Sequence, residues 1–400
     1  MEKSNKIRLL AGEIFPKLVE FRRHIHMHPE LSMEEQKTAA FICSVLDDWG
    51  IPYRSDVGGF GVVAIVHGDN PGKCIALRAD MDALPIHEKN QLEFASTVPG
   101  VMHACGHDGH VASLLGVAYI LNKIRSGFDG CFKLIFQPSE ETFPGGALKM
   151  IEDGVLQNPT VSAIIGQHVL PGLNTGSIGL KSGPYMASTD EIYITVDGRG
   201  GHGATPELNI DPVVIASHII VALQQITSRY ANPSIPTVLS FGRIIADGRT
   251  NIIPDSVKIE GTIRTFDEKW RAAAHEKILS ISKGLAEGFG AQCSVEIHHG
   301  YPFLVNDEKC TEIARNSATE FLGADKVVEL PLRMTAEDFA YFSQNVPGIY
   351  YRLGVTDPAT GQPSANLHTA NFDMDENALM TGCSTMACIA LELLNEFNER

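Results

Sequence analysis

The order of apolar and polar positions along the chain predicts a mixed α/β protein. In the first 170 residues, stretches with helical periodicity alternate with short apolar runs typical of buried strands. Helices are expected at 7–28, at 111–124 and near Ala147. A further helix is expected between the first two, opened by Ser32-Met33-Glu34-Glu35 as a capping box and ending near Gly50. The expected strands are 61–67, 74–78, 131–137 and 161–166. This alternation is typical of an α/β layer with a largely parallel sheet.

The pattern changes near Ser182-Gly183-Pro184. From there to about residue 300 the expected order is strand, helix, strand, strand, helix, strand, over 191–196, 212–229, 237–245, 256–264, 269–287 and 293–298. This split β-α-β order predicts a ferredoxin-like α+β insert. The α/β pattern then resumes with 308–322, 349–353 and 375–397.

A chain of 400 residues is longer than one hydrophobic core usually supports. We therefore expect two domains. The first is discontinuous, over 1–186 and 301–400, and the second is inserted at 187–300.

Charge and composition exclude several classes of protein. A net charge of −16 argues against binding nucleic acid or an anionic membrane surface. The N-terminal segment has no apolar core of a signal peptide, and no apolar run is long enough to span a bilayer. The eight cysteines occur singly, several within apolar patterns, which indicates reduced core residues. We expect a cytoplasmic protein.

The richest candidate chemistry lies in the stretch from Met102 to His110, where Cys105 and His107 are one residue apart. The helix expected at 111–124 places this stretch at a helix N-terminus, where backbone N–H groups favour a thiolate. Converging thiol and imidazole groups predict a metal site. A cysteine nucleophile beside a histidine remains an alternative.

Three further segments carry metal-binding residue types at the ends of predicted elements. Glu140 and Glu141 follow the strand at 131–137, His168 follows the strand at 161–166, and His368 lies in a polar loop before the last helix. Adjacent glutamates on irregular backbone point in different directions, so one can bind metal while the other faces substrate. Mixed S, N and O ligands suit Zn²⁺, with Mn²⁺, Co²⁺ or Ni²⁺ also possible. The number of candidates favours a two-metal site.

A glycine-rich turn, Gly198-Arg199-Gly200-Gly201-His202-Gly203, formally matches a dinucleotide-binding fingerprint. Pro206 interrupts the position where a phosphate-binding helix should already run, and no strand ending in an acidic residue follows about 20 residues later. An NAD-dependent oxidoreductase rests on this turn alone. We interpret it as a turn that presents His202.

The motifs MHACGHDGH, QPSEE, GQH, GGHGATPE, NIIPD, GTIRTF, AEDF and LHTANFD occur in this order. In that order they resemble metal-dependent N-acyl-amino-acid amidohydrolases of the M20 type, a group that includes hippurate hydrolases, auxin-conjugate hydrolases, aminoacylases and carboxypeptidases. The resemblance covers essentially the whole chain from His28 onward. It implies a zinc-exopeptidase-like catalytic domain with a dinuclear site, and a smaller lid domain through which a homodimer or higher homo-oligomer forms.

The resemblance also implies roles for particular residues. The metal ligands would be Cys105, His107, Glu141, His168 and His368, with Cys105 as the bridge. Glu140 matches the general base, and Asp82 an orienting carboxylate behind the ligands. In the lid, His202 resembles a histidine that reaches the partner subunit's site, while Asn251 and Arg264 resemble residues that grip the substrate's carboxylate end.

Two differences from more distant peptidase relatives indicate which branch of the family the chain resembles. More distant peptidase relatives have a His-x-Asp motif where this chain has Asp80-Met81-Asp82, and an aspartate where it has Cys105. Both favour the amidohydrolase branch. A third departure, Thr369-Ala370 in place of a Pro-containing version after His368, leaves the ligand in place and the local loop geometry open.

The expected function is hydrolysis of the amide bond of N-acetyl, N-benzoyl or similar amino acids. Three alternatives stay open at this point. One is a di-metal exopeptidase or dipeptidase of the same fold. Another is a non-catalytic metal-binding scaffold protein, against which the presence of Glu140 speaks. The last is a hydrolase with Cys105 as nucleophile, whose activity would survive chelators.

Overall fold

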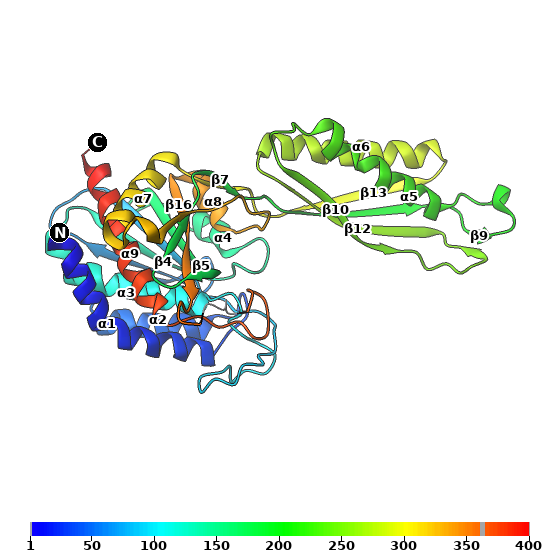
Figure 1. The fold of residues 1–400 in the computed structure, drawn as a ribbon. Coiled ribbons are helices and arrows are strands. Elements are labelled where there is room, and N and C mark those ends of the chain that lie inside the picture. The colour runs from blue at the N-terminus through cyan, green and yellow to red at the C-terminus, as the bar shows by residue number, and fades with distance from the viewer. Residues whose placement is uncertain (1, 361–364, 400) are drawn as a thin grey trace. The chain divides into compact units, whose positions relative to one another are not determined.

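The computed structural model describes residues 2–360 and 365–399 and divides into two compact units (Figure 1). The first unit lies within 1–185, 305–332 and 338–400, and the second within 186–304 and 333–337. The chain therefore leaves the first unit, builds the second and returns.

The first unit is built on a mixed sheet of eight strands, mostly parallel at its centre, which confirms the predicted α/β class. The strand order is β1-β2-β4-β3-β5-β16-β6-β15. Its strands are β1 (Tyr53–Val57), β2 (Gly61–His67), β3 (Cys74–Asp80), β4 (Cys131–Gln137), β5 (Val161–Asn174), β6 (Ile178–Leu180), β15 (Val327–Glu329) and β16 (Gly348–Thr356). The neighbours β4, β3, β5 and β16 are all parallel, so their carboxyl ends meet at one edge. Two short strands, β7 (Gly183–Met186) and β14 (Leu304–Asn306), lie where the chain passes between the units.

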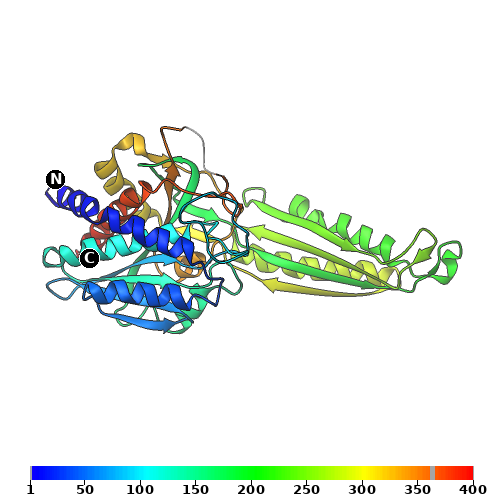
Figure 2. The ribbon, with the colours of Figure 1, turned by 90° about the horizontal axis from the view of Figure 1, so that it is seen from below.

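Helices cover both faces of this sheet. They are α1 (Glu2–Met27), α2 (Gln36–Asp48), α3 (His107–Lys123), α4 (Gly146–Glu152), α7 (Glu308–Leu322), α8 (Phe339–Asn345) and α9 (Ala378–Asn398). Helices α1, α3 and α9 pack on one another, and the buried Tyr351 of β16 belongs to their core. Its neighbour Tyr350 contacts Phe339 of α8 instead. Because side chains alternate along a strand, α8 covers the opposite face. Figure 2 shows the unit from below.

Three predicted boundaries are wrong. Helix α1 begins before residue 7. Helix α3 begins at His107 rather than 111, because Gly106 takes a left-handed conformation (φ 83°) and the residues after it are buried as helix. Strand β5 continues to Asn174, because pairing with β16 extends past His168, which is opposite Arg352. His168 is therefore inside a strand and not at its end.

The predicted capping box is also wrong. Helix α2 begins at Gln36, and Glu35 at its N-cap position makes no capping hydrogen bond. The Ser32 hydroxyl donates to Asp82 instead, and the Glu35 carboxylate accepts from Ser139. Both side chains form hydrogen bonds with segments far away in the sequence and not with the helix backbone.

The second unit has one four-stranded antiparallel sheet, in the order β10-β12-β8-β13, with two helices against it. Its main elements are β8 (Asp190–Asp197), α5 (Pro212–Leu223), β10 (Thr237–Ile245), β12 (Ser256–Thr265), α6 (Glu268–Gly288) and β13 (Gln292–His299). A separate two-stranded ribbon pairs β9 (Gly201–His202) with β11 (Ile252–Ile253). The order of the main elements is the split β-α-β arrangement that the sequence pattern predicts.

A buried ion network stabilises the start of β8. Asp190 accepts hydrogen bonds from Arg271 Nε at 2.8 Å and from His275 Nε2 at 2.7 Å. Burial acts to raise the pKa of Asp190, but these hydrogen bonds hold it at about 2. The carboxylate is therefore charged at neutral pH.

Helix α9 is long and apolar enough to cross a membrane by length and composition, but 78% of its most apolar stretch is buried in the protein. The buried core helix of a protein can have the same length and composition, so these features are weak evidence for a membrane-spanning segment. None of the eight cysteines, all within the described residues, forms a disulfide.

Candidate metal centre

The predicted metal-binding side chains come from segments that meet at the carboxyl edge of the parallel strands. Cys105 and His107 lie at the start of α3, Glu141 follows β4, and His168 projects from β5. His368 belongs to the loop before α9. Ligands of open α/β sheets bind at this edge.

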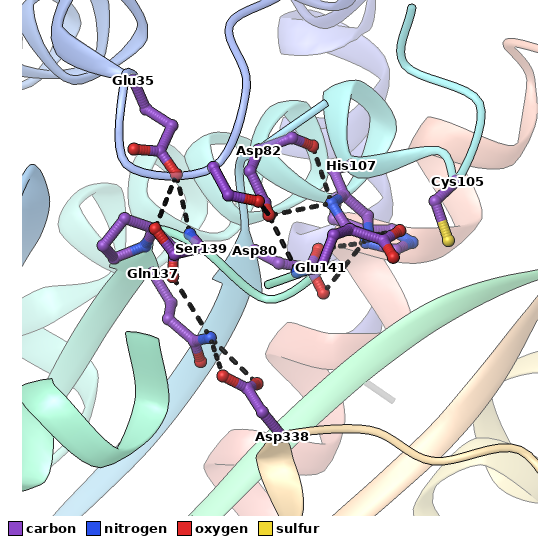
Figure 3. A network of polar contacts seen from close by, with 12 residues as sticks. Glu35, Asp80, Asp82, Cys105, His107, Gln137, Ser139, Glu141 and Asp338 are labelled. Atoms are coloured by element: carbon purple, nitrogen blue, oxygen red, sulfur yellow. Dashed lines mark hydrogen bonds and ion pairs between the residues drawn. The ribbon is translucent and has the colours of Figure 1, made fainter. Parts of the chain in front are cut away.

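The five side chains form a continuous series of contacts. Figure 3 shows three of them, Cys105, His107 and Glu141. Cys105 Sγ lies 3.4 Å from His168 Nε2 and 3.3 Å from His368 Nε2. Glu141 Oε1 lies 3.2 Å from His368 Nε2 and 4.0 Å from His107 Nε2. Two groups of possible ligands result, Cys105 with His107 and His168, and Cys105 with Glu141 and His368. The thiol belongs to both groups, as a bridging ligand would.

The two buried histidines are oriented by their other ring nitrogen. His107 Nδ1 donates to the backbone oxygen of Asp82 at 2.9 Å, and the Asp82 carboxylate lies 3.3 Å from the same nitrogen. His168 Nδ1 donates to the backbone oxygen of Val169 at 2.7 Å. In each case Nε2 is the ring nitrogen left to face the site. Histidines that bind metals are oriented in this way.

These residues fit divalent cations. Within the described part of the chain, His107 Nε2 is buried without a hydrogen-bond partner. Leaving such an atom unsatisfied costs about 1–3 kcal/mol, and a coordinated cation would satisfy it. A set of one thiol, three imidazoles and a carboxylate suits Zn²⁺ and its neighbours.

The protonation of Cys105 differs from the sequence-based expectation of a thiolate. Burial, followed by the nearby Glu141 carboxylate, raises the pKa of this thiol, which outweighs any effect of the helix N-terminus. Hydrogen bonds to Cys105 and Glu141 raise the pKa of His368 to about 10. Burial and the neighbouring Arg352 lower the pKa of His168 well below its usual range. Burial acts to lower the pKa of His107, but the nearby Asp80 and Cys105 raise it well above its usual range. A cation would therefore displace protons from Cys105, His107 and His368, and would find His168 already neutral.

Glu140 lies beside the ligands without being one of the five. The residue is 8% exposed, and its carboxylate groups with His107 and Glu141 among the possible ligand atoms. Ser139, immediately before it, has a left-handed backbone (φ 56°). This bend follows the end of β4 and directly precedes both glutamates.

Comparison with known proteins identifies the group to which this site belongs. The model of peptidase family M20/M25/M40 matches residues 76–392. The chain belongs to this family. It is 39% identical to the N-acetyl-L-cysteine deacetylase of Bacillus subtilis over 398 residues, covering 100% of this chain and 92% of the relative. It is also 39% identical to thermostable carboxypeptidase 2 of Saccharolobus solfataricus over 399 residues, covering 99% and 100%.

A solved structure is similar over the whole length. The crystal structure of the Bacillus subtilis YXEP protein, described as a dinuclear metal-binding peptidase from the M20 family, superposes with a TM-score of 0.83 at 36% identity. The match covers 96% of this chain and 99% of that one. The fold and the family of this chain are thus established independently of its site.

Two residues that sequence reasoning did not single out, Arg78 and Asp80, support the candidate ligands of this M20 chain through His110. Asp80 Oδ1 lies 2.5 Å from His110 Nδ1, and His110 Nε2 accepts from the backbone nitrogen of Val169, next to His168. Arg78 holds the other oxygen of Asp80. Charged residues inside the buried strand β3 were the signal that could have indicated them.

A second set of buried hydrogen bonds holds the start of α3. The fully buried Arg22 of α1 donates to Asp108, adjacent to His107, at 3.0 Å and to Asp373, in the loop after His368, at 2.5 Å. His26 donates to the same Asp108 at 2.9 Å. Arg22 therefore connects two segments that carry candidate ligands. Its partners there, Asp108 and Asp373, are 265 positions apart in the sequence.

The candidate lid residues lie in the second unit, at two separate places. His202 and Asn251 belong to the exposed β9–β11 ribbon, where Gly203 N donates to Asn251 O at 2.9 Å. Arg264 is half-buried at the other end of β12, with its guanidinium donating to Met334 O at 3.2 Å. The run of β12 from Ser256 to Arg264 spans roughly 25 Å at about 3.3 Å per residue. Within one chain, His202 and Asn251 therefore do not share a binding position with Arg264.

Proposed function

We propose that this M20 chain hydrolyses the amide bond of N-acyl amino acids, releasing a carboxylic acid and a free amino acid. The observation that carries the proposal is the convergence of five metal-binding side chains around Cys105, with the carboxylate of Glu140 beside them. The similarity to an N-acetyl-L-cysteine deacetylase over the whole chain supports this substrate class.

Two divalent cations would be held by Cys105, His107, Glu141, His168 and His368, with Cys105 shared. When bound, they would supply a water of lowered pKa and polarise the amide carbonyl. The soft thiolate and the imidazoles favour Zn²⁺, Co²⁺, Ni²⁺ or Mn²⁺ over Mg²⁺ or Ca²⁺.

Glu140 is the proposed general base. It would take a proton from the attacking water and donate it to the nitrogen of the leaving amine, so one carboxylate serves both transfers. General acid–base catalysis of this kind contributes on the order of 10²–10⁴ in rate. Its burial supports the role, because a water-excluded carboxylate keeps the proton within the site.

Arg264 is the proposed partner of the substrate's α-carboxylate. Its planar guanidinium can form two parallel hydrogen bonds to a carboxylate, which a lysine cannot. Asn251 and His202 belong to the other end of the second unit. We propose that they act on the site of a partner subunit in a homodimer formed through this unit, with His202 donating to the developing oxyanion.

A second candidate is a di-metal exopeptidase that cleaves peptides rather than acylated amino acids. The similarity to a thermostable carboxypeptidase over 99% of the chain favours considering it. The same metals, base and carboxylate-binding arginine would serve both reactions. The two differ in what the acyl side of the pocket accepts.

A substrate panel separates the two candidates. The purified protein, loaded with Mn²⁺, Zn²⁺ or Co²⁺, is assayed on N-acetyl and N-benzoyl amino acids and on dipeptides with the same C-terminal residue. The proposal expects a kcat/KM at least about tenfold higher on the acylated amino acids, a difference of about 1.4 kcal/mol in transition-state binding. Preference for the dipeptides would replace it with the exopeptidase.

A further inference from the structure

The segment between α1 and α2 contacts both loops that present the acidic groups of the site. Ser32 Oγ donates to Asp82 Oδ2 at 2.7 Å. The backbone nitrogen of Met33 donates to Ser139 Oγ at 2.9 Å. Glu35 Oε1 accepts from the backbone nitrogen of Ser139 at 2.7 Å and from its hydroxyl at 3.1 Å (Figure 3). The residues expected to cap a helix hold the catalytic loop instead.

The contacts from Met33 and Glu35 both reach Ser139. Its left-handed backbone, with φ at 56°, is unfavourable for a residue with a side chain and persists only when neighbouring groups hold it. Its carbonyl accepts from Gly146 N at 2.9 Å, so Glu35 on one side and Gly146 on the other fix the peptide groups around the bend. The next two residues along the chain are Glu140 and Glu141. A rotation at Ser139 would move both carboxylates.

The same loop is joined to Asp82. Asp82 Oδ2 accepts from Ser32 and from the backbone nitrogen of Glu141 at 2.9 Å. Asp82 also holds the ring of His107. Ser32 and Glu35 therefore act on one connected set of groups, which reaches a metal-binding histidine and two glutamates.

The burial of the Glu35 carboxylate is unfavourable, and helix capping does not explain it. Its side chain is fully buried, and its Oε2 has no hydrogen-bond partner among the described residues. Burial of a carboxylate with one unsatisfied oxygen is unfavourable. Exposed acidic residues serve as well at a helix N-terminus, so the burial of Glu35 needs another reason.

We propose that Glu35 is a positioning residue for the reaction, which acts through the backbone of Ser139 to aim Glu140 at substrate and Glu141 at metal, while Ser32 holds Asp82. The inference rests on the proposed function for the role of Glu140. The placement of Glu141 can be tested without turnover.

The test compares substitutions of Glu35 that keep or withdraw the acceptor oxygen. Glu35→Gln keeps an oxygen at the position of Oε1 and should retain kcat within about threefold. Glu35→Asp withdraws the acceptor by one C–C bond, about 1.5 Å, and misplacements of about 1 Å can cost 10²-fold in rate. It should lower kcat by at least tenfold while KM changes by less than threefold. Glu34→Gln, the exposed neighbour, is the matched control and should match the wild type.

A second readout needs no substrate. The visible absorption of the Co²⁺-loaded protein reports the ligands and geometry of the metal. Glu35→Asp should change its band positions or intensities at full metal occupancy, whereas Glu35→Gln and Glu34→Gln should not. If Glu35→Asp does not fold, Ser139→Ala replaces it. That variant removes the hydroxyl that bridges Met33 and Glu35, and should change the spectrum and lower kcat by at least threefold.

Wild-type kcat and an unchanged Co²⁺ spectrum in Glu35→Asp would overturn the inference. So would a loss of kcat that excess metal fully restores, because Glu35 would then affect only metal affinity. A tenfold loss in Glu35→Gln would show that charge, and not the acceptor position, is what matters, and would also overturn it. If the wild type hydrolyses no N-acyl amino acid, the proposed function fails, and the spectra alone still decide the positioning of Glu141.

Discussion

Asp82 holds His107 through two oxygens, its backbone carbonyl at 2.9 Å and its carboxylate at 3.3 Å from Nδ1 of the ring. The second carboxylate oxygen of Asp82 accepts from the backbone nitrogen of Glu141. One residue thus connects two proposed metal ligands that come from different segments of the chain. The relationship explains how an aspartate that is not a ligand could control metal affinity.

The first prediction follows from this relationship. Asp82→Asn keeps the backbone carbonyl but removes the charge and one acceptor, so His107 and the Glu141 loop lose part of their orientation. We expect the dissociation constant for Zn²⁺ or Co²⁺ to rise at least about tenfold, the lower end of the range for such outer contacts. Competition with a chromogenic chelator measures it. Asp69→Asn, at an exposed aspartate, is the control, and equal affinities in the two variants would contradict the role of Asp82.

The second prediction concerns the proposed base. Glu140→Gln should bind the same amount of metal as the wild type, because the five ligands remain, and should lose at least about 10²-fold in kcat. Elemental analysis and initial rates on one N-acyl amino acid measure both quantities. Glu152→Gln, on the exposed side of α4, should leave both unchanged. Turnover at the wild-type rate in Glu140→Gln would remove this residue from the mechanism.

The third prediction follows from the separation of His202 and Arg264 within one second unit. If His202 serves the partner subunit, a mixture of His202→Ala and Glu140→Gln chains should recover activity, because hybrid dimers contain one site with both groups intact. Random exchange should restore about a quarter of the wild-type sites. Activity is followed after mixing, and differently tagged chains confirm the exchange. Confirmed exchange without recovery would place His202 outside catalysis or within its own subunit's site.

The fourth prediction concerns stability against pH. Burial acts to lower the pKa of His26, but hydrogen bonds to Asp108 and Glu88 raise it to about 9. A histidine whose pKa is raised on folding contributes stability that is complete below about pH 6.5 and is lost as the pH rises to 9. The free energy of unfolding should therefore decrease over this window, by up to about 3 kcal/mol at about 1.4 kcal/mol per unit.

Urea denaturation of the chelator-treated protein at several pH values between 6 and 9.5 measures this dependence. His26→Gln can keep one hydrogen bond to Asp108 but cannot titrate, so its decrease should be smaller by the contribution of His26. An equal slope in the two proteins would show that the network around Asp108 does not hold a proton on His26.

Some of the site could be predicted from sequence because the information is local. Cys105 and His107 stand together in one motif, and Glu140 with Glu141 directly follows an apolar strand. The parallel strands then bring their carboxyl ends together, whatever the loops between them. His168 is predictable for the same reason, although the strand that carries it continues beyond it.

Other features depend on contacts that no local pattern encodes. Glu35 reads as a capping residue because the Ser-x-x-Glu spacing is typical of a helix start, yet its partner Ser139 is 104 residues away. Arg22 lies on an amphipathic helix, and its burial depends on Asp373 at the far end of the chain. The thiol pKa of Cys105 follows from burial, which overrides the helix N-terminus that the sequence suggests. Long-range packing decided each of these.

The most direct test of the whole account is metal content per chain, measured by elemental analysis together with hydrolysis of N-acetyl and N-benzoyl amino acids before and after chelation. We predict about two divalent cations per chain, loss of hydrolysis on chelation, and recovery on adding Mn²⁺, Zn²⁺, Co²⁺ or Ni²⁺. A protein that binds no metal under these conditions, or that hydrolyses these substrates equally well after its metal is removed, would contradict the proposed function.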